Sequence, residues 1–141
     1  MATSRTATTH WEGTLFEGAG SVTMESSGIG TYDVTWASRA EEPEGRTSPE
    51  ELIAGAHSAC FSMALSKALN DAGSPATSLD TQAQVSFTPG TGITGVHLSV
   101  RGVVEGLDEA RFRELAEGAK DGCPVSQALA GTSITLDASL A

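Results

Sequence analysis

A long helix of low polarity with a well-marked start is the feature that most constrains this fold. Ser48 suits the N-cap and Pro49 the first helical position, and Glu51 stands where a capping box needs it. The pattern continues to about Leu69. One face is expected to carry Leu52, Ala56, Ala59, Cys60, Met63 and Ala64. Because these residues are mostly small, we expect a central helix, covered by sheet on one side and by a second copy of itself on the other.

Alternating residues and turn signals predict the remaining elements. Strands are expected at 6–11, 20–25, 31–37, 79–87, 93–104 and 133–137, and further helices at 108–120 and from Pro124 to 130. Residues 39–47 are charged and contain Pro43 and Gly45, so they are expected to form a loop. The order β-β-β-α-β-β-α-α-β predicts a single α+β domain over residues 1–141 with a mainly antiparallel sheet.

Charge and hydropathy argue against two classes of partner. The chain has 8 Lys and Arg against 18 Asp and Glu, a net charge of −10, which would repel nucleic acid and anionic lipid. No stretch is expected to approach the ~18 apolar residues of a membrane span, and the polar start has no apolar signal region. We therefore expect no nucleic-acid or membrane partner and a cytoplasmic location.

Two cysteines, Cys60 and Cys123, carry the chemical signal. Cys60 lies on the apolar face of the long helix, where a free cysteine is often only a small buried residue. Cys123 precedes Pro124 at the start of a helix, where free backbone N–H groups favour a thiolate and lower its pKa. A thiol pair able to do redox chemistry is one interpretation, and two passive cysteines are the other.

The three histidines do not make a metal site. His57 lies three residues before Cys60 and could lower a thiol pKa or bind a metal, although a packing role is favoured. His10 and His97 add no His-x3-His spacing, and there is no Cys-x-x-Cys motif, so a zinc site has little support. No phosphate-binding loop or nucleophile elbow is present. From these residues alone, the prediction stops at an α+β protein with a candidate thiol pair.

Two segments resemble a known family. Residues 48–66 read SPEELIAGAHSACFSMALS and residues 122–129 read GCPVSQAL. Both resemble the osmotically inducible protein C (OsmC) family, whose sister group is the organic hydroperoxide resistance (Ohr) proteins. The similarity extends to HWEG at 10–13 and ITLD at 134–137, and residues 36–39 (WASR) are similar to the osmotically inducible branch.

The resemblance implies an intertwined homodimer, with sheets wrapped around central helices and two active sites at the interface. It implies a thiol-dependent peroxidase of oxidative or osmotic stress defence that prefers organic hydroperoxides to hydrogen peroxide and uses no metal or cofactor. By the same resemblance, Cys60 matches the peroxidatic cysteine and Cys123 the resolving one. Arg39 and Glu50 match the family's arginine and carboxylate, with Arg46 as a competitor for Arg39.

The chemistry fits these residue types. An unperturbed thiol with a pKa of ~8.5 is only a few per cent ionised at neutral pH, so a nearby guanidinium would favour the reactive thiolate of Cys60. Glu50 would hold Arg39 through a bidentate pair. Peroxide attack leaves a sulfenic acid on Cys60, which Cys123 converts to a disulfide. The resemblance implies a dithiol reductant of the lipoyl type.

Two other functions remain open. A non-catalytic protein of the same fold could bind an apolar ligand or act as a stress-related interaction protein, with its cysteines as passengers; Arg39 and Glu50 argue against this, because a passenger thiol needs neither. A cysteine hydrolase using Cys60 and His57 is disfavoured, since no residue is evident to orient the imidazole or stabilise an oxyanion.

Overall fold

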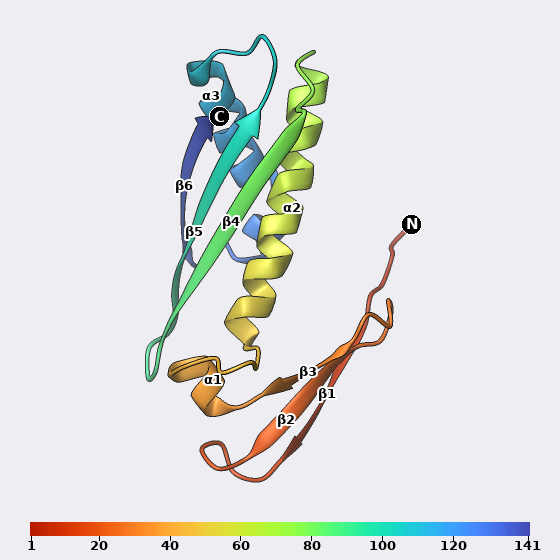
Figure 1. Ribbon diagram of the computed structural model, residues 1–141, viewed down its shortest axis with the longest axis vertical. Coiled ribbons are helices and arrows are strands. Elements are labelled where there is room, and N and C mark those ends of the chain that lie inside the picture. Colours follow the sequence, from red (N-terminus) through yellow and green to blue (C-terminus); the bar gives the residue numbers. More distant parts are fainter. The chain divides into compact units, whose positions relative to one another are not determined.

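The computed structural model describes residues 1–141, which form two compact units, Met1–Leu52 and Ile53–Ala141. Each unit contains a three-stranded sheet, and the long helix α2 begins in the first unit and continues through the second. The chain is thus α+β, as the sequence predicts. Figure 1 identifies the elements along the chain.

The first unit begins with an antiparallel meander. Strands β1 (Ala7–Glu12), β2 (Ala19–Met24) and β3 (Thr31–Val34) pair in that order, with Thr9 opposite Val22 and Val22 opposite Tyr32. The predicted strands agree with the first two to within about a residue. The third is shorter than predicted.

A short helix, α1 (Trp36–Ala40), replaces the end of the predicted third strand and the start of the predicted loop. Thr35 stops the strand because it caps this helix: its hydroxyl accepts a hydrogen bond from the Ser38 N–H at 3.0 Å, and the Ser38 hydroxyl accepts one from the Thr35 N–H at 3.0 Å. Alternation alone could not show this reciprocal cap. Its consequence is that Arg39 lies on a helix.

Helix α2 (Pro49–Asp71) begins where the sequence predicts. The Ser48 hydroxyl accepts a hydrogen bond from the Glu51 N–H at 3.1 Å, so Ser48 is the N-cap. The Glu51 carboxylate accepts a hydrogen bond from the Thr47 hydroxyl. The side chains of Thr47 and Ser48 therefore both hydrogen-bond to Glu51 in the first turn of α2.

The second unit is built on strands β4 (Ser78–Thr88), β5 (Gly92–Val103) and β6 (Ser133–Leu140), in that spatial order. β4 and β5 form the predicted antiparallel hairpin, with a register shift at Ser86/Phe87. β6 pairs with β5 in parallel, because α3 (Glu109–Gly122) and α4 (Pro124–Ala128) carry the chain back across the sheet. α3 starts at Asp108, whose carboxylate accepts a hydrogen bond from the Arg111 N–H at 2.8 Å.

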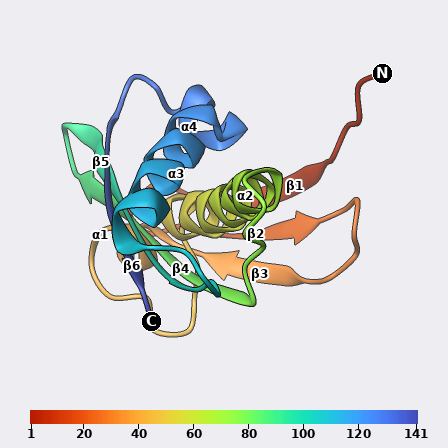
Figure 2. The same ribbon diagram turned by 90° about the horizontal axis from the view of Figure 1, so that it is seen from above.

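The core of this unit lies between the sheet and helices α2 and α3, which Figure 2 shows on one side of the strands. Its buried members are Phe61, Leu65, Leu69, Val96, Leu98, Val100, Val104, Phe112, Ala116, Ala119 and Cys123. Ala110 of α3 is exposed, because the buried stripe of that helix follows Phe112, Ala116 and Ala119.

The buried face of α2 differs from the predicted one. His57, Phe61, Leu65 and Leu69, spaced four residues apart, are fully buried, while Ala56, Ala59 and Met63 are exposed. Small residues do not distinguish one face of the helix from another, so the large side chains of Phe61, Leu65 and Leu69 decide which stripe enters the core. The other stripe, from Ala56 to Met63, is left open.

α2 also corrects the expectation about membrane-span length. By length and composition it is long and apolar enough to cross a membrane, with a hydropathy of 1.2 over its best window. Core helices pass the same test. Since Phe61, Leu65 and Leu69 pack in the core of the second unit, we assign α2 to that core.

Candidate active site

Cys60 and Cys123 lie together in the unit Ile53–Ala141. Cys60 is in the middle of α2, and Cys123 is the N-cap of α4 and at the same time the C-cap of α3. Both are free thiols, and a hydrogen bond links the two side chains. Cys60 is partly accessible to solvent, whereas Cys123 is fully buried. The fold therefore brings together two cysteines that are far apart in the sequence, and only Cys60 meets solvent.

The two thiols have opposite pKa shifts. Burial raises the pKa of Cys60, and the hydrogen bond to Cys123 adds to this, while a hydrogen bond from the backbone of Val125 acts in the opposite sense. Burial also raises the pKa of Cys123, but hydrogen bonds from Cys60, from the backbone of Ser126 and Val125 and from the Ser126 hydroxyl outweigh it, so that this pKa is lowered. The directions of these shifts favour a thiolate on Cys123 over one on Cys60, in keeping with a cysteine at a helix start.

His57 and Ser126 extend this cluster into the core. The His57 Nε2 atom lies 2.7 Å from the Ser126 Oγ atom, and the two side chains are 0% and 6% exposed. His57 Nδ1 is buried without a hydrogen-bond partner. Burial lowers the pKa of His57, so the ring is neutral at pH 7. His57, for which a packing role was predicted, thus has a hydrogen-bond partner at only one of its two ring nitrogens. Ser126 was not identified as a site residue from the sequence. The one signal that could have identified it is its position three residues after Cys123.

Arg39 and Glu50 pair in the unit Met1–Leu52. Arg39 Nε lies 3.0 Å and 3.2 Å from the two carboxylate oxygens of Glu50, and a terminal guanidinium nitrogen lies 2.8 Å from Oε1. Glu50 is buried and Arg39 is about one-third exposed. Arg46, the competitor, is exposed in the loop before α2 and forms no ion pair with Glu50. The fork of Arg39 matches the carboxylate, which is the arrangement that fixes a guanidinium most firmly.

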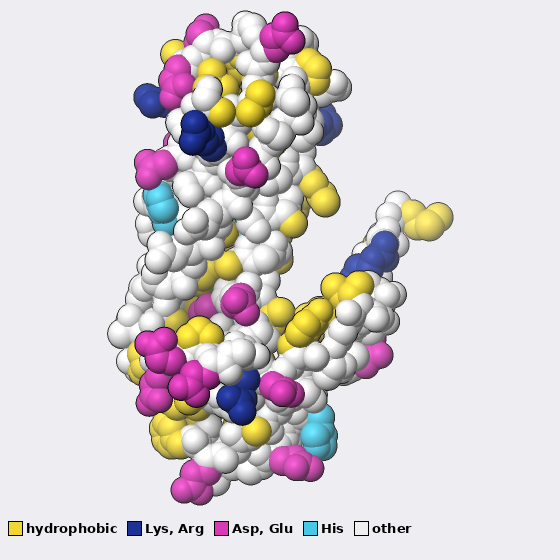
Figure 3. Space-filling view, in the orientation of Figure 1, with side chains coloured by type: hydrophobic (Ala, Val, Ile, Leu, Met, Phe, Trp, Pro, Cys, Tyr) yellow, Lys and Arg dark blue, Asp and Glu magenta, His cyan; other side chains and the backbone are white.

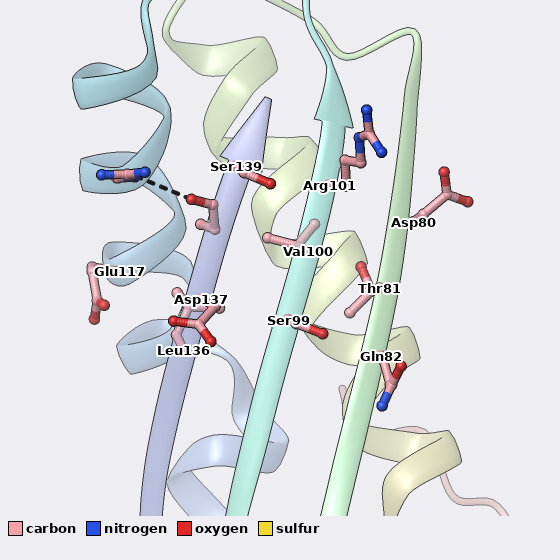
Figure 4. A pocket seen from close by; sticks show the side chains of 12 residues that line it. Asp80, Thr81, Gln82, Ser99, Val100, Arg101, Glu117, Leu136, Asp137 and Ser139 are labelled. Atoms are coloured by element: carbon pink, nitrogen blue, oxygen red, sulfur yellow. Dashed lines mark hydrogen bonds between the residues drawn. The ribbon is translucent and has the colours of Figure 1, made fainter. Parts of the chain in front are cut away.

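A separate hollow lies on the outer face of the β4–β5–β6 sheet. Its volume is about 800 Å³, and its walls include Asp80, Gln82, Ser99, Arg101 and Asp137. Figure 4 shows these side chains on the strands. The Arg113 guanidinium, which also lines the hollow, donates to the Ala138 carbonyl at 3.1 Å. Ser99 and Arg101 alternate with the core residue Val100, so they point away from the core. The hollow shares no residue with the cysteine cluster.

The surface and the titratable clusters show no alternative chemistry. Acidic side chains are scattered over the face seen in Figure 3, in keeping with the net charge of −10. No group of three or more His, Cys, Asp or Glu residues is placed to hold a metal ion. The arrangement that can react is therefore the thiol pair, with a hydroxyl and an imidazole behind it.

Comparison with known sequences gives consistent results. Residues 42–139 match the family model described as OsmC-like protein. The chain is 45% identical over 131 residues to peroxiredoxin OsmC of Escherichia coli (strain K12), which covers 91% of this chain and 90% of the relative. It is 30% identical over 115 residues to organic hydroperoxide resistance protein OhrB of Bacillus subtilis (strain 168), which covers 80% and 83% of the two chains.

Solved structures show the same fold. The crystal structure of OhrB of Bacillus subtilis matches with a TM-score of 0.66 and 25% identity, covering 96% of this chain and 98% of the other. A structure from Legionella pneumophila, described as an organic hydroperoxide resistance protein OsmC, matches with a TM-score of 0.71 and 24% identity, covering 99% and 98%.

Proposed function

Since the chain belongs to the OsmC-like protein family, we propose that it is a thiol-dependent peroxidase that reduces organic hydroperoxides by means of Cys60 and Cys123. The names of two relatives, a peroxiredoxin and an organic hydroperoxide resistance protein, support the peroxidase role and the substrate class. The observation that carries the proposal is the contact between a partly exposed Cys60 and a fully buried Cys123.

The difference in exposure assigns the roles. A peroxide must reach the first sulfur, and Cys60 is the one that meets solvent. Its thiolate attacks the terminal peroxide oxygen, the O–O bond breaks, and the alkoxide takes up a proton to leave as an alcohol. Cys60 becomes a sulfenic acid. Cys123 then attacks the Cys60 sulfur and forms the disulfide before further oxidation can occur.

Cys60 needs a source of positive charge to react in this way. The groups around it within its own unit raise its pKa, which disfavours the thiolate. We assign the opposing charge to the Arg39 guanidinium, which Glu50 fixes by its bidentate hydrogen bonds. A guanidinium near the sulfur would lower the Cys60 pKa, and each unit of pKa is worth ~1.4 kcal/mol.

The apolar residues that follow Cys60 in the sequence differ in exposure. Phe61 is fully buried in the core and cannot contact a substrate, whereas Met63 is 73% exposed. A preference for alkyl over hydrogen peroxide therefore rests on the names of the relatives and on other apolar surface, not on Phe61. Equal catalytic efficiency with hydrogen peroxide and a bulky alkyl hydroperoxide would contradict this preference.

We also propose that the protein is a homodimer. The open stripe of α2, Ala56, Ala59 and Met63, is apolar, and the first unit exposes Trp11, Leu15, Phe16, Ile29 and Tyr32. Such surface is typical of an interface between subunits. A cytoplasmic dithiol of the lipoyl type is the proposed reductant, and stress defence the proposed setting.

A thiol count with mass spectrometry tests the function. The reduced protein is treated with one equivalent of cumene hydroperoxide, and the bond formed is located by peptide mapping. An intramolecular Cys60–Cys123 disulfide with one alcohol released per chain is the expected result. Two unreacted thiols in folded protein would contradict the peroxidase and favour the non-catalytic, ligand-binding alternative.

A further inference from the structure

His57 and Ser126 join the thiol pair by a continuous line of hydrogen bonds. The line runs from His57 Nε2 to Ser126 Oγ at 2.7 Å, from the Ser126 hydroxyl to the Cys123 sulfur, and from there to the Cys60 thiol. His57 is separated from Ser126 by 69 positions in the sequence, and both are buried. Burying a chain of polar groups costs free energy unless each group in it has a hydrogen-bond partner.

The single hydroxyl proton of Ser126 decides the direction of this line. If Ser126 donates to the Cys123 sulfur, its oxygen has only lone pairs left for His57, so His57 must donate from Nε2–H. The neutral ring then has no proton on Nδ1, and Nδ1 is the atom that has no partner. The reverse direction would bury an unpaired Nδ1–H, and orphaned buried donors are rarer in proteins than under-used acceptors.

We propose that His57 and Ser126 are positioning residues for the second step of the reaction: Nε2–H of His57 orients Ser126, and the Ser126 hydroxyl holds Cys123 as the attacking thiolate. This inference rests on the proposed peroxidase function. It gives a role to a buried imidazole that the first step does not use. A hydrogen bond to a thiolate favours the charged form. The Ser126 hydroxyl is one of the groups that lower the pKa of Cys123, after the Cys60 thiol and the backbone N–H groups of Ser126 and Val125.

The step balances without a further reagent. The Cys123 thiolate donates an electron pair to the Cys60 sulfur, the S–S bond forms, and the S–O bond of the sulfenic acid breaks. The hydroxide that leaves takes a proton from solvent and becomes water. Cys123 is oxidised and Cys60 is reduced by the same electron pair. As the charge on Cys123 disappears, the Ser126 hydroxyl loses its charged acceptor, and His57 stays neutral throughout.

The magnitude follows from thiol chemistry. A rise of one pKa unit in Cys123 lowers its thiolate fraction up to about tenfold and raises the nucleophilicity of the remaining thiolate about threefold. Disulfide formation should therefore slow about threefold per unit. Formation of the sulfenic acid on Cys60 should not slow, because the two thiols share a hydrogen bond and a higher pKa of Cys123 favours the thiolate on Cys60.

The first measurement is the Cys123 pKa, taken from ultraviolet thiolate absorbance in a Cys60→Ala background. Ser126→Ala is expected to raise this pKa, and Ser126→Thr, which keeps the hydroxyl, to restore it. His57→Met should raise it less, because the hydroxyl remains, and should have no further effect once Ser126 is Ala. An unchanged pKa in Ser126→Ala, or additive effects of the two substitutions, would overturn the proposal.

The kinetic test uses both cysteines. Ser126→Ala should form the sulfenic acid at least as fast as wild type and the disulfide several-fold more slowly, seen by rapid quench and mass spectrometry. Nitrogen NMR shifts of His57 in the unmodified protein should identify the Nε2–H tautomer, a result that needs no variant. An Nδ1–H tautomer would overturn the proposal. If wild type forms no disulfide at all, the peroxidase function fails instead, while the pKa results still decide the role of Ser126.

Discussion

Arg39 donates hydrogen bonds to Glu50 through two nitrogens: Nε lies 3.0 Å and 3.2 Å from the two carboxylate oxygens, and a terminal nitrogen lies 2.8 Å from Oε1. The carboxylate is buried and the guanidinium partly exposed. Glu50 therefore has its charge compensated by one residue. Arg39 is held in one orientation by a residue in the first turn of the helix that carries Cys60.

Replacing Arg39 should affect both chemistry and stability. Arg39→Gln is expected to slow sulfenic acid formation by about threefold to tenfold for each unit by which the Cys60 pKa rises, because the thiolate fraction falls up to about tenfold per unit. It should also reduce the free energy of unfolding by about 3 kcal/mol, the low end for breaking a buried pair, because Glu50 becomes an uncompensated buried charge while Arg39 is partly exposed. Single-turnover kinetics and urea unfolding measure the two effects. Arg46→Gln is the matched control; if it slows the step and Arg39→Gln does not, the arginine assignment is wrong.

The cysteine roles can be separated in one turnover. Cys123→Ser should consume one peroxide and stop with a sulfenic acid on Cys60, detectable by dimedone labelling, because the attacking thiol is missing. Cys60→Ser should consume almost none. A Cys60→Ser variant that reacts rapidly and stores the sulfenic acid on Cys123 would reverse the assignment.

His57 should make stability depend on pH in a known direction. Burial lowers its pKa, so the unfolded chain binds a proton that the folded chain does not. Its contribution is complete above the ordinary His pKa of ~6.5 and is lost as the pH falls below that value. The melting temperature should therefore fall between about pH 6.5 and pH 5. In His57→Gln this slope should be smaller; an identical slope would assign the pH dependence to other groups.

Gly102 should not tolerate even one methyl group. A Cβ at this position of β5 would lie 2.8 Å from two ring atoms of Phe112 and 3.1 Å from Leu79, and the ring is fully buried. Gly102→Ala is expected to cost about 1–3 kcal/mol by overpacking. In Gly118→Ala on α3, where nothing lies within 4 Å, a gain of about 0.5–1 kcal/mol is expected. Equal effects in thermal unfolding would contradict this account of the core.

The proposed dimer can be broken at the open face of α2. Met63→Glu should shift the protein toward monomer in sedimentation velocity, because a charge would be buried in the apolar interface. Val103→Glu is the control, since Val103 is also exposed and apolar but stands near the end of β5. If both variants keep the wild-type mass, the α2 face is not the interface.

Local patterns in the sequence were sufficient for most of the elements. The Ser48 cap, the Asp108 start and the hairpin of β4 and β5 are short-range features, set by side chains that bond to nearby backbone or by turn residues. The α1 helix was missed because its cap uses a Ser in place of the usual Glu or Gln, inside a segment whose alternation is typical of a strand.

Sequence patterns alone were enough to identify the two thiols, the helix that carries Cys60, the helix start at Cys123 and the family to which the chain belongs. Three features became clear from the packing of the folded chain: which stripe of α2 is buried, the parallel pairing of β6 with β5, and the contact between His57 and Ser126. The physical reason is the range of the interactions. Caps and turns depend on residues a few positions apart, whereas burial and the hydrogen-bond line at Cys123 depend on packing between distant segments, which no local pattern encodes.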